Sequence, residues 1–113
     1  MNTRDLVLVL TTMPDDGQAE ALAVTLVEER LAACVNIHPP MRSVYRWNGA
    51  VEREGERQLV IKTVRDRLAD LEARLRAAHP YELPEWIVLA ADAVSEGYLR
   101  WALAGTRGDE GTR

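Results

Sequence analysis

The sequence contains one cysteine, one lysine and no phenylalanine among its 113 residues. The cysteine, Cys34, cannot form a disulfide within the chain, and it cannot alone supply a thiolate cluster for zinc. Iron–sulfur clusters also need several cysteine ligands, so the sequence excludes an iron–sulfur electron carrier. The single lysine, Lys62, is the only side-chain amine, and arginine supplies the remaining strong positive charge.

An excess of positive charge is absent as well, because the formal net charge is −4 at pH 7. We therefore expect no binding to nucleic acid or to an anionic membrane surface. The apolar run Leu6–Leu10 near the start of the sequence is too short for the core of a secretory signal or for a membrane-spanning helix. The sequence thus predicts a cytoplasmic protein.

The chain does contain enough apolar material for one core. Hydrophobic residues make up 47% of the sequence, and the chain length is typical of one domain. The last residues are polar and rich in glycine. We predict one domain over residues 1–104 and a disordered C-terminal tail over residues 105–113.

The spacing of apolar residues predicts the order β-α-β-β-α-β with an extra C-terminal helix. Strands are expected over Leu6–Leu10, Ala33–Ile37, Met41–Trp47, Leu59–Thr63 and Glu85–Ala90, the second and third being one long strand interrupted by two prolines. Helices are expected from a capping box at Asp15 to Leu31, over residues 68–79, and after Ser95. This order is typical of a ferredoxin-like α+β sandwich, in which two helices cover one face of an antiparallel sheet.

A long β-hairpin between the strand that ends at Trp47 and the strand that returns toward Leu59–Thr63 has the strongest local signal. Asn48 and Gly49 tolerate the positive φ angles that a type I′ turn requires. A two-residue turn fixes the register, so Trp47 is expected opposite Ala50, and the facing pairs continue from there along the hairpin.

Several strands are apolar at consecutive positions, whereas an antiparallel sheet with one face in water alternates apolar and polar residues. Two helices cover only one face, and the C-terminal helix is too short to cover the other. Because a large exposed apolar face promotes association, we expect copies of the chain to bury it between them. The hairpin, with Tyr45 and Trp47, is expected to reach onto a neighbouring copy.

Two residues are candidate metal ligands. Cys34 is a soft ligand and His79 a borderline one, so together they suit copper or zinc if folding or a neighbouring copy brings them close. The alternative for Cys34 is a small buried hydrophobe in an apolar strand. The alternative for His79 is a structural residue at a helix C-terminus, where positive charge is favoured.

Four further residues are candidate ligands for a polar small molecule. Glu56 and Lys62 flank an apolar strand segment, and Tyr81 and Glu82 follow the second predicted helix. Together they offer charged and hydrogen-bonding groups of the kind that line a polar cleft. An internal ion pair between Glu56 and Lys62 is the alternative.

Several sequence blocks, in this order, resemble the CutA family of divalent-ion tolerance proteins. The blocks are Thr12-x-Pro14, Leu26-Val27, Leu31-Ala32-Ala33-Cys34-Val35-Asn36, Ser43-Val44-Tyr45-Arg46-Trp47-x-Gly49, Lys62-Thr63, His79-Pro80-Tyr81-Glu82-x-Pro84-Glu85 and Tyr98-Leu99-x-Trp101. The resemblance implies a homotrimer of ferredoxin-like subunits, shaped like the PII signalling proteins, with inter-subunit clefts that bind copper or another ligand. Relatives discussed for copper binding carry a cysteine at the position of Thr11 and a histidine at that of Ala78.

Three functional hypotheses follow. The first is a trimeric divalent-cation tolerance protein that binds copper, and the second is a PII-like regulator that binds a small metabolite at inter-subunit clefts. The third, an acylphosphatase-like enzyme using Arg42 and Asn36, depends on fold analogy alone. The sequence contains no nucleophile elbow, phosphate loop or zinc-protease helix, so we expect no enzymatic activity.

Overall fold

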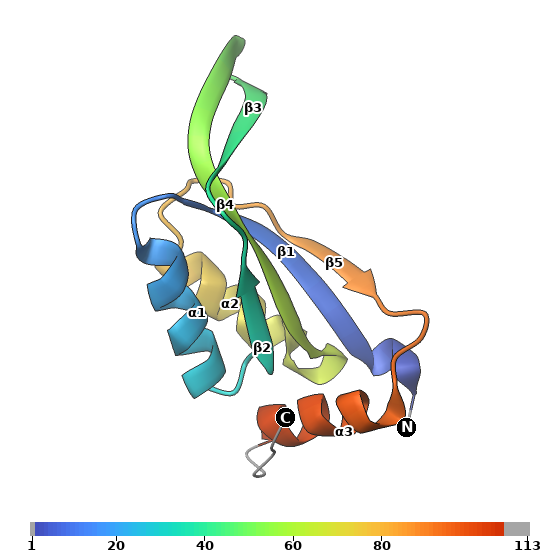
Figure 1. Ribbon diagram of the computed structural model, residues 1–113. Helices are drawn as coiled ribbons and strands as arrows, with labels where there is room; N and C mark the ends of the chain where they lie inside the picture. The colour runs from blue at the N-terminus through green and yellow to red at the C-terminus, as the bar shows by residue number, and fades with distance from the viewer. Residues whose placement is uncertain (1, 108–113) are drawn as a thin grey trace.

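The computed structural model describes residues 2–107 (Figure 1). The helices and strands along the chain are η1 (Thr3–Asp5), β1 (Leu6–Pro14), α1 (Gln18–Glu28), β2 (Cys34–Ile37), β3 (Met41–Trp47), β4 (Ala50–Val64), η2 (Arg65–Arg67), α2 (Leu68–Ala78), β5 (Ile87–Ala90) and α3 (Glu96–Arg107), where η marks a 3-10 helix. The order is β-α-β-β-α-β with an extra helix at the end. The predicted ferredoxin-like α+β arrangement is therefore confirmed.

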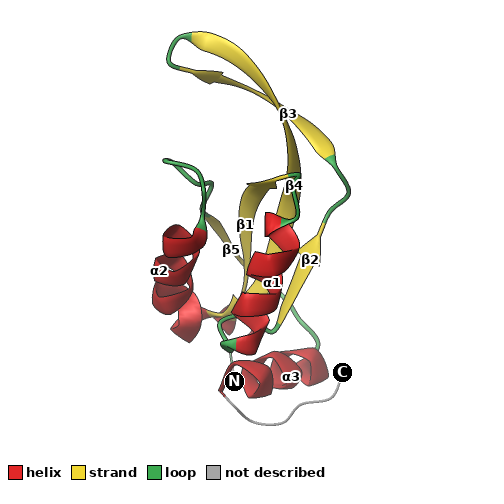
Figure 2. Ribbon diagram, turned by 90° about the vertical axis from the view of Figure 1, so that its left-hand side faces the viewer, coloured by secondary structure: helices red, strands yellow, loops and turns green. Residues whose placement is uncertain are grey.

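The five strands form one antiparallel sheet in the order β2-β4-β1-β5, and β3 pairs with the distal part of β4. β4 has 15 residues, and within residues 2–107 it is the only strand that pairs with three others. Helices α1 and α2 cover one face of the sheet (Figure 2). Helix α3 lies across the end of the sheet, below the other two helices in both views.

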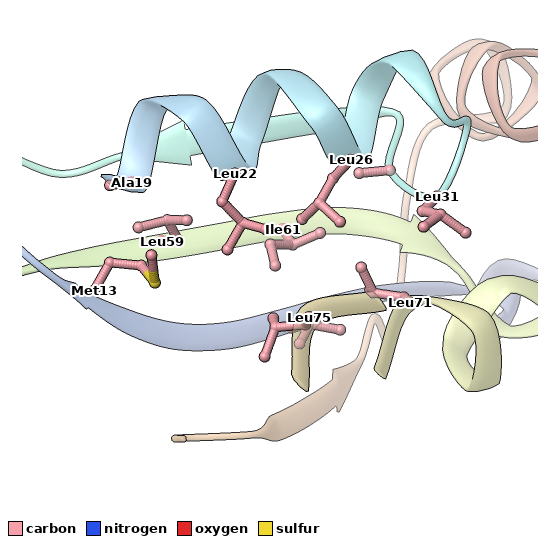
Figure 3. Close-up of a cluster of buried hydrophobic side chains, with 11 residues drawn as sticks. Met13, Ala19, Leu22, Leu26, Leu31, Leu59, Ile61, Leu71 and Leu75 are labelled. Carbon is pink, nitrogen blue, oxygen red and sulfur yellow. The ribbon is translucent and has the colours of Figure 1, made fainter. Parts of the chain in front are cut away.

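The main core lies between the sheet and the two covering helices. Alternate residues of β1 and β4, such as Val9 and Ile61, are fully buried there, and they meet Leu26 of α1 and Leu71 of α2 (Figure 3). A second, smaller cluster joins α3 to the ends of β1 and β4 through Leu99. The two clusters explain how three helices are held on one small sheet.

The β3–β4 hairpin extends beyond the sheet as a twisted arm (Figure 1). Asn48 and Gly49 have φ angles of 50° and 81°, which are the two positive values of a type I′ turn. The register places Trp47 opposite Ala50 and Val44 opposite Arg53. The predicted turn and register are both confirmed.

Helix α1 begins later than predicted. Asp15 does not cap it, because its carboxylate accepts a 2.8 Å hydrogen bond from Arg57 Nε instead. Asp16 Oδ1 accepts from the backbone N–H of Gln18, and Gly17 between them takes a φ of 90°, which glycine tolerates without a Cβ penalty. The helix also ends at Glu28, three residues early, since Arg30 has a φ of 60°.

Helix α3 ends later than predicted. The Ser95 hydroxyl accepts a hydrogen bond from the Tyr98 N–H, as expected of an N-cap. The helix then continues to Arg107, so the prediction of a disordered tail is wrong for residues 105–107. Thr106 is buried and its hydroxyl donates to the Ala102 carbonyl, which anchors this last turn. The rest of the predicted tail, residues 108–113, lies outside the described residues.

The second face of the sheet carries apolar side chains that no helix covers. Side chains alternate across a strand, so the neighbours of the buried positions on β1, β4 and β5 point to this side. We call it the open face; its apolar side chains are Leu8, Leu10, Val60, Ile87 and Leu89, and Lys62 lies on it opposite Leu8. Ile87 and Leu89 are 43% and 47% exposed. None of the helices within residues 2–107 is long and apolar enough to cross a membrane.

Candidate functional site

The segment between α2 and β5 folds against the base of the arm. Tyr81 of this segment donates a 2.7 Å hydrogen bond from its hydroxyl to Glu56 Oε2. Glu56 lies where β4 leaves the sheet, opposite Pro14 on one side and Met41 on the other, and it is only 6% exposed. A buried carboxylate needs hydrogen-bond partners, so Tyr81 stabilises this charge.

His79 fixes the start of the same segment. The N–H of Tyr81 donates to His79 Nδ1 at 3.1 Å, so Nδ1 is an acceptor and carries no proton. The other nitrogen, Nε2, lies 2.7 Å from the Thr12 carbonyl oxygen and donates to it. His79 is buried, and its ring lies 4.9 Å from that of Tyr81. The ring therefore uses both nitrogens to hold the segment on β1.

Two residues that we did not single out from the sequence complete this cluster. Gln58 Nε2 donates to the Thr11 carbonyl at 2.7 Å and to Glu85 Oε2 at 3.0 Å. Gln58 thereby ties β1 to the residues that precede β5. One signal was available in the sequence: Gln58 lies directly before the apolar run of β4. It is two residues from Glu56, so both side chains point to the same face of the strand.

The acidic residues at the base of the arm affect both nearby tyrosines. Burial, the hydrogen bond to Glu56 and the Glu56 charge raise the pKa of Tyr81 far above its ordinary value. Partial desolvation and the charges of Glu54, Glu56 and Glu52 raise the pKa of Tyr45 as well. The glutamates at the base of the arm therefore favour the protonated form of both tyrosines.

The raised pKa of Tyr81 predicts a pH effect on stability. Tyr81 keeps its proton to higher pH in the folded state than in the unfolded chain, where a tyrosine pKa is about 10. Its contribution is fully present below about pH 10 and is lost as the pH rises further. We expect Tyr81→Phe to lower the free energy of unfolding by about 1–2 kcal/mol at pH 8. Denaturant unfolding should show this difference shrinking above about pH 10. An equal difference at pH 8 and pH 11 would contradict the assignment.

The four predicted ligand residues are only partly brought together. Glu56 and Tyr81 are in direct contact. Glu82 follows Tyr81 in the same segment, but its side chain is exposed. Lys62 is six positions from Glu56 on β4, about 20 Å at strand spacing. The alternative of a Glu56–Lys62 ion pair is therefore wrong within one chain. Lys62 lies instead between Leu8 of β1 and Cys34 of β2.

The two predicted metal ligands also lie apart. Cys34 is half-buried and pairs with Lys62, whereas His79 binds the carbonyl of Thr12, whose register partner is Gln58. Lys62 and Gln58 are four positions apart on β4, which is about 13 Å at strand spacing. In addition, β2 and β1 lie on opposite sides of β4. Within residues 2–107, no group of three or more histidine, cysteine, aspartate or glutamate side chains is placed to hold a metal ion. Cys34 and His79 of one chain do not fit a shared ion.

Two hollows on the described surface lie away from this cluster. One lies between α3 and the end of β4 and includes Arg65, Asp66 and Arg107. The other lies between α1 and α2 and includes Met13 and Arg74. Both are shallow, and neither contains Glu56, His79 or Tyr81.

Comparison with known proteins gives a consistent result. The family model for "CutA1 divalent ion tolerance protein" matches residues 7–104. The divalent-cation tolerance protein CutA of Pectobacterium atrosepticum is 42% identical over 91% of this chain and 94% of its own length. The CutA of Thermus thermophilus is 44% identical over 83% of this chain and 91% of its own length. The solved structure of CutA from Synechococcus elongatus is 43% identical, covers 94% of both chains, and superposes with a TM-score of 0.88.

Proposed function

Because the chain belongs to the CutA1 divalent ion tolerance family, we propose that it is a cytoplasmic homotrimer that binds Cu²⁺ in response to metal stress. The observation that carries the assembly is the open face. It presents apolar side chains from three adjacent strands, and the chain has no further helix among its described residues to cover them. The resemblance to the family implies that the assembly has three subunits.

One association between copies would cover the open face and also complete the candidate site. Burying the open face between copies removes an apolar patch from water, which favours association at about 25 cal/mol per Å² of apolar surface. We place a neighbouring copy, in the same association, at the base of the arm beside the Glu56–Tyr81 cluster. The proposal therefore places the ligand site between subunits.

Copper binding is proposed through ligands from more than one copy. Imidazole suits Cu²⁺, and thiolate prefers Cu⁺. Binding at His79 costs at least one of its two hydrogen bonds, to the Tyr81 N–H or to the Thr12 carbonyl. We therefore expect weak or moderate Cu²⁺ affinity at His79, and a contribution from Cys34 only after copper is reduced.

A copper titration tests this proposal. Wild type, His79→Ala and Cys34→Ser are titrated with Cu²⁺ at neutral pH by calorimetry, then with ascorbate present. The matched control is His38→Ala, since His38 is the only other histidine and is exposed. We expect His79→Ala to lower the Cu²⁺ affinity and His38→Ala to leave it unchanged. Loss of binding in His38→Ala alone would instead place the copper at an adventitious surface site.

The second candidate is a PII-like regulator that binds a small metabolite and has no catalytic role. The two hydrogen bonds of the His79 nitrogens favour it over copper binding, because a metal would have to break at least one of them. The carboxylates of Glu56 and Glu85 would supply hydrogen-bond acceptors at the arm base. Failure of wild type to take up copper in either oxidation state would select this candidate. Saturable binding of a small organic molecule, weakened by Tyr81→Phe, would then support it.

A further inference from the structure

The hollow between α3 and the end of β4 lies at the opposite end of the sheet from the arm (Figure 1). Its volume is about 350 Å³. Small-molecule sites range from about 300 to 1,000 Å³, so the hollow suits a small ligand. Six residues line it, and they come from η1, β4, η2 and α3: Asp5, Val64, Arg65, Asp66, Leu103 and Arg107.

The hollow has an apolar floor. Val64 is 4% exposed and belongs to the cluster that holds α3 on the sheet, and Leu103 packs against the same cluster. Leu103 and Arg107 are four residues apart on α3, so their side chains lie on the same face of that helix. Water screens charges less beside a buried apolar surface than on an open one. The floor therefore covers an apolar group and strengthens ion pairs formed above it.

Four charged side chains, two of each sign, surround this floor. They are Asp5, Asp66, Arg65 and Arg107. Within residues 2–107 none of the four forms an ion pair, whereas six other arginines each pair with a carboxylate. Arg65 donates to the Arg4 carbonyl at 3.0 Å, which uses one of its five N–H donors. The hollow thus brings together two cations and two anions that have no ion-pair partner in the described chain.

We propose that this hollow binds a small zwitterion with an apolar side chain, which is the chemistry of a free apolar amino acid. Arg65 and Arg107 bind its carboxylate, because a guanidinium donates charge-assisted hydrogen bonds to both carboxylate oxygens. Asp5 and Asp66 accept hydrogen bonds from its ammonium group. A simple anion meets two aspartates as well as the arginines, and a simple amine meets two arginines. The zwitterion is the class that matches all four charges.

Calorimetric titration of the full chain with L-leucine tests this inference. Two related probes each lack one charge: 4-methylpentanoate has no ammonium group, and 3-methylbutylamine has no carboxylate. We expect saturable binding of one L-leucine per chain. We expect at least about tenfold weaker binding of each related probe, since each loses one set of charge-assisted hydrogen bonds.

Two variants remove one charge each from the hollow. They are Arg107→Gln and Asp66→Asn, and both side chains are exposed, so the fold of the chain is little affected. We expect each to weaken L-leucine binding at least about tenfold. The matched controls are Arg100→Gln on α3 and Asp70→Asn on α2, which lie outside the hollow. They should bind L-leucine within about twofold of wild type, and circular dichroism verifies that every variant is folded.

Two results would overturn the inference. The first is no saturable binding of L-leucine to wild type, or binding that neither hollow variant weakens. The second is 4-methylpentanoate or 3-methylbutylamine binding as tightly as L-leucine, because one pair of charges would then recognise nothing. The hollow contains neither His79 nor Cys34 and is formed by one chain. Its failure is therefore distinguishable from failure of copper binding or of assembly.

Discussion

Leu89→Glu is expected to separate the assembled protein into single chains. Leu89 is already 47% exposed in the isolated chain, so the substitution costs the fold of one subunit little. At the open face of an assembly the new carboxylate would be buried without a partner, which costs several kcal/mol. A loss of about 3 kcal/mol raises a dissociation constant on the order of 100-fold.

Val24→Glu is the matched control for this experiment. Val24 is 49% exposed, but it lies on α1, on the side of the sheet opposite to the open face. Light scattering over a range of concentrations should show Val24→Glu assembled like wild type and Leu89→Glu as a 12.7 kDa chain. Equal assembly of the two variants would exclude the open face as the interface.

Leu26→Ala is expected to cost about 2–5 kcal/mol of unfolding free energy. Leu26 has no exposed surface and points from α1 into the core between β4 and α2 (Figure 3), so its removal leaves a cavity. The neighbouring residue Val27 is 43% exposed, and Val27→Ala should change stability by less than about 0.5 kcal/mol. Urea unfolding of all proteins at one chain concentration gives the comparison, because assembly makes stability depend on concentration. Similar losses in both variants would mean that Leu26 is not in the core.

Features that depend on neighbouring residues were predictable from the sequence. The turn at Asn48 and Gly49 fixes the hairpin register through backbone geometry alone, and the observed pairs agree with it. The start of α1 was not predicted, because a long-range ion pair between Asp15 and Arg57 removes the expected cap. The last turn of α3 was missed for the same kind of reason, since packing of Thr106 and a hydrogen bond from Arg30 to the Gly105 carbonyl stabilise it.

The candidate site was predictable in part. Tyr81 and Glu56 were both selected for their chemistry, but their contact depends on how the segment after α2 folds onto the sheet. No local pattern encodes that path, so the bonds from His79 to β1 and from Gln58 to Glu85 were not foreseen. The separation of Glu56 from Lys62, in contrast, follows from strand length once both are placed on β4.

The position of β4 in the sheet also has a consequence for how the chain folds. Its distal half pairs with β3 through a two-residue turn, a closure that takes microseconds. Its proximal half must wait for β1, which lies before α1, β2 and β3 in the chain, and closing that loop costs more entropy. The arm should therefore form first, while the apolar half of β4 is still unpaired. During this interval the arginines and glutamates of the arm flank the exposed apolar segment, and such flanking charges slow its aggregation.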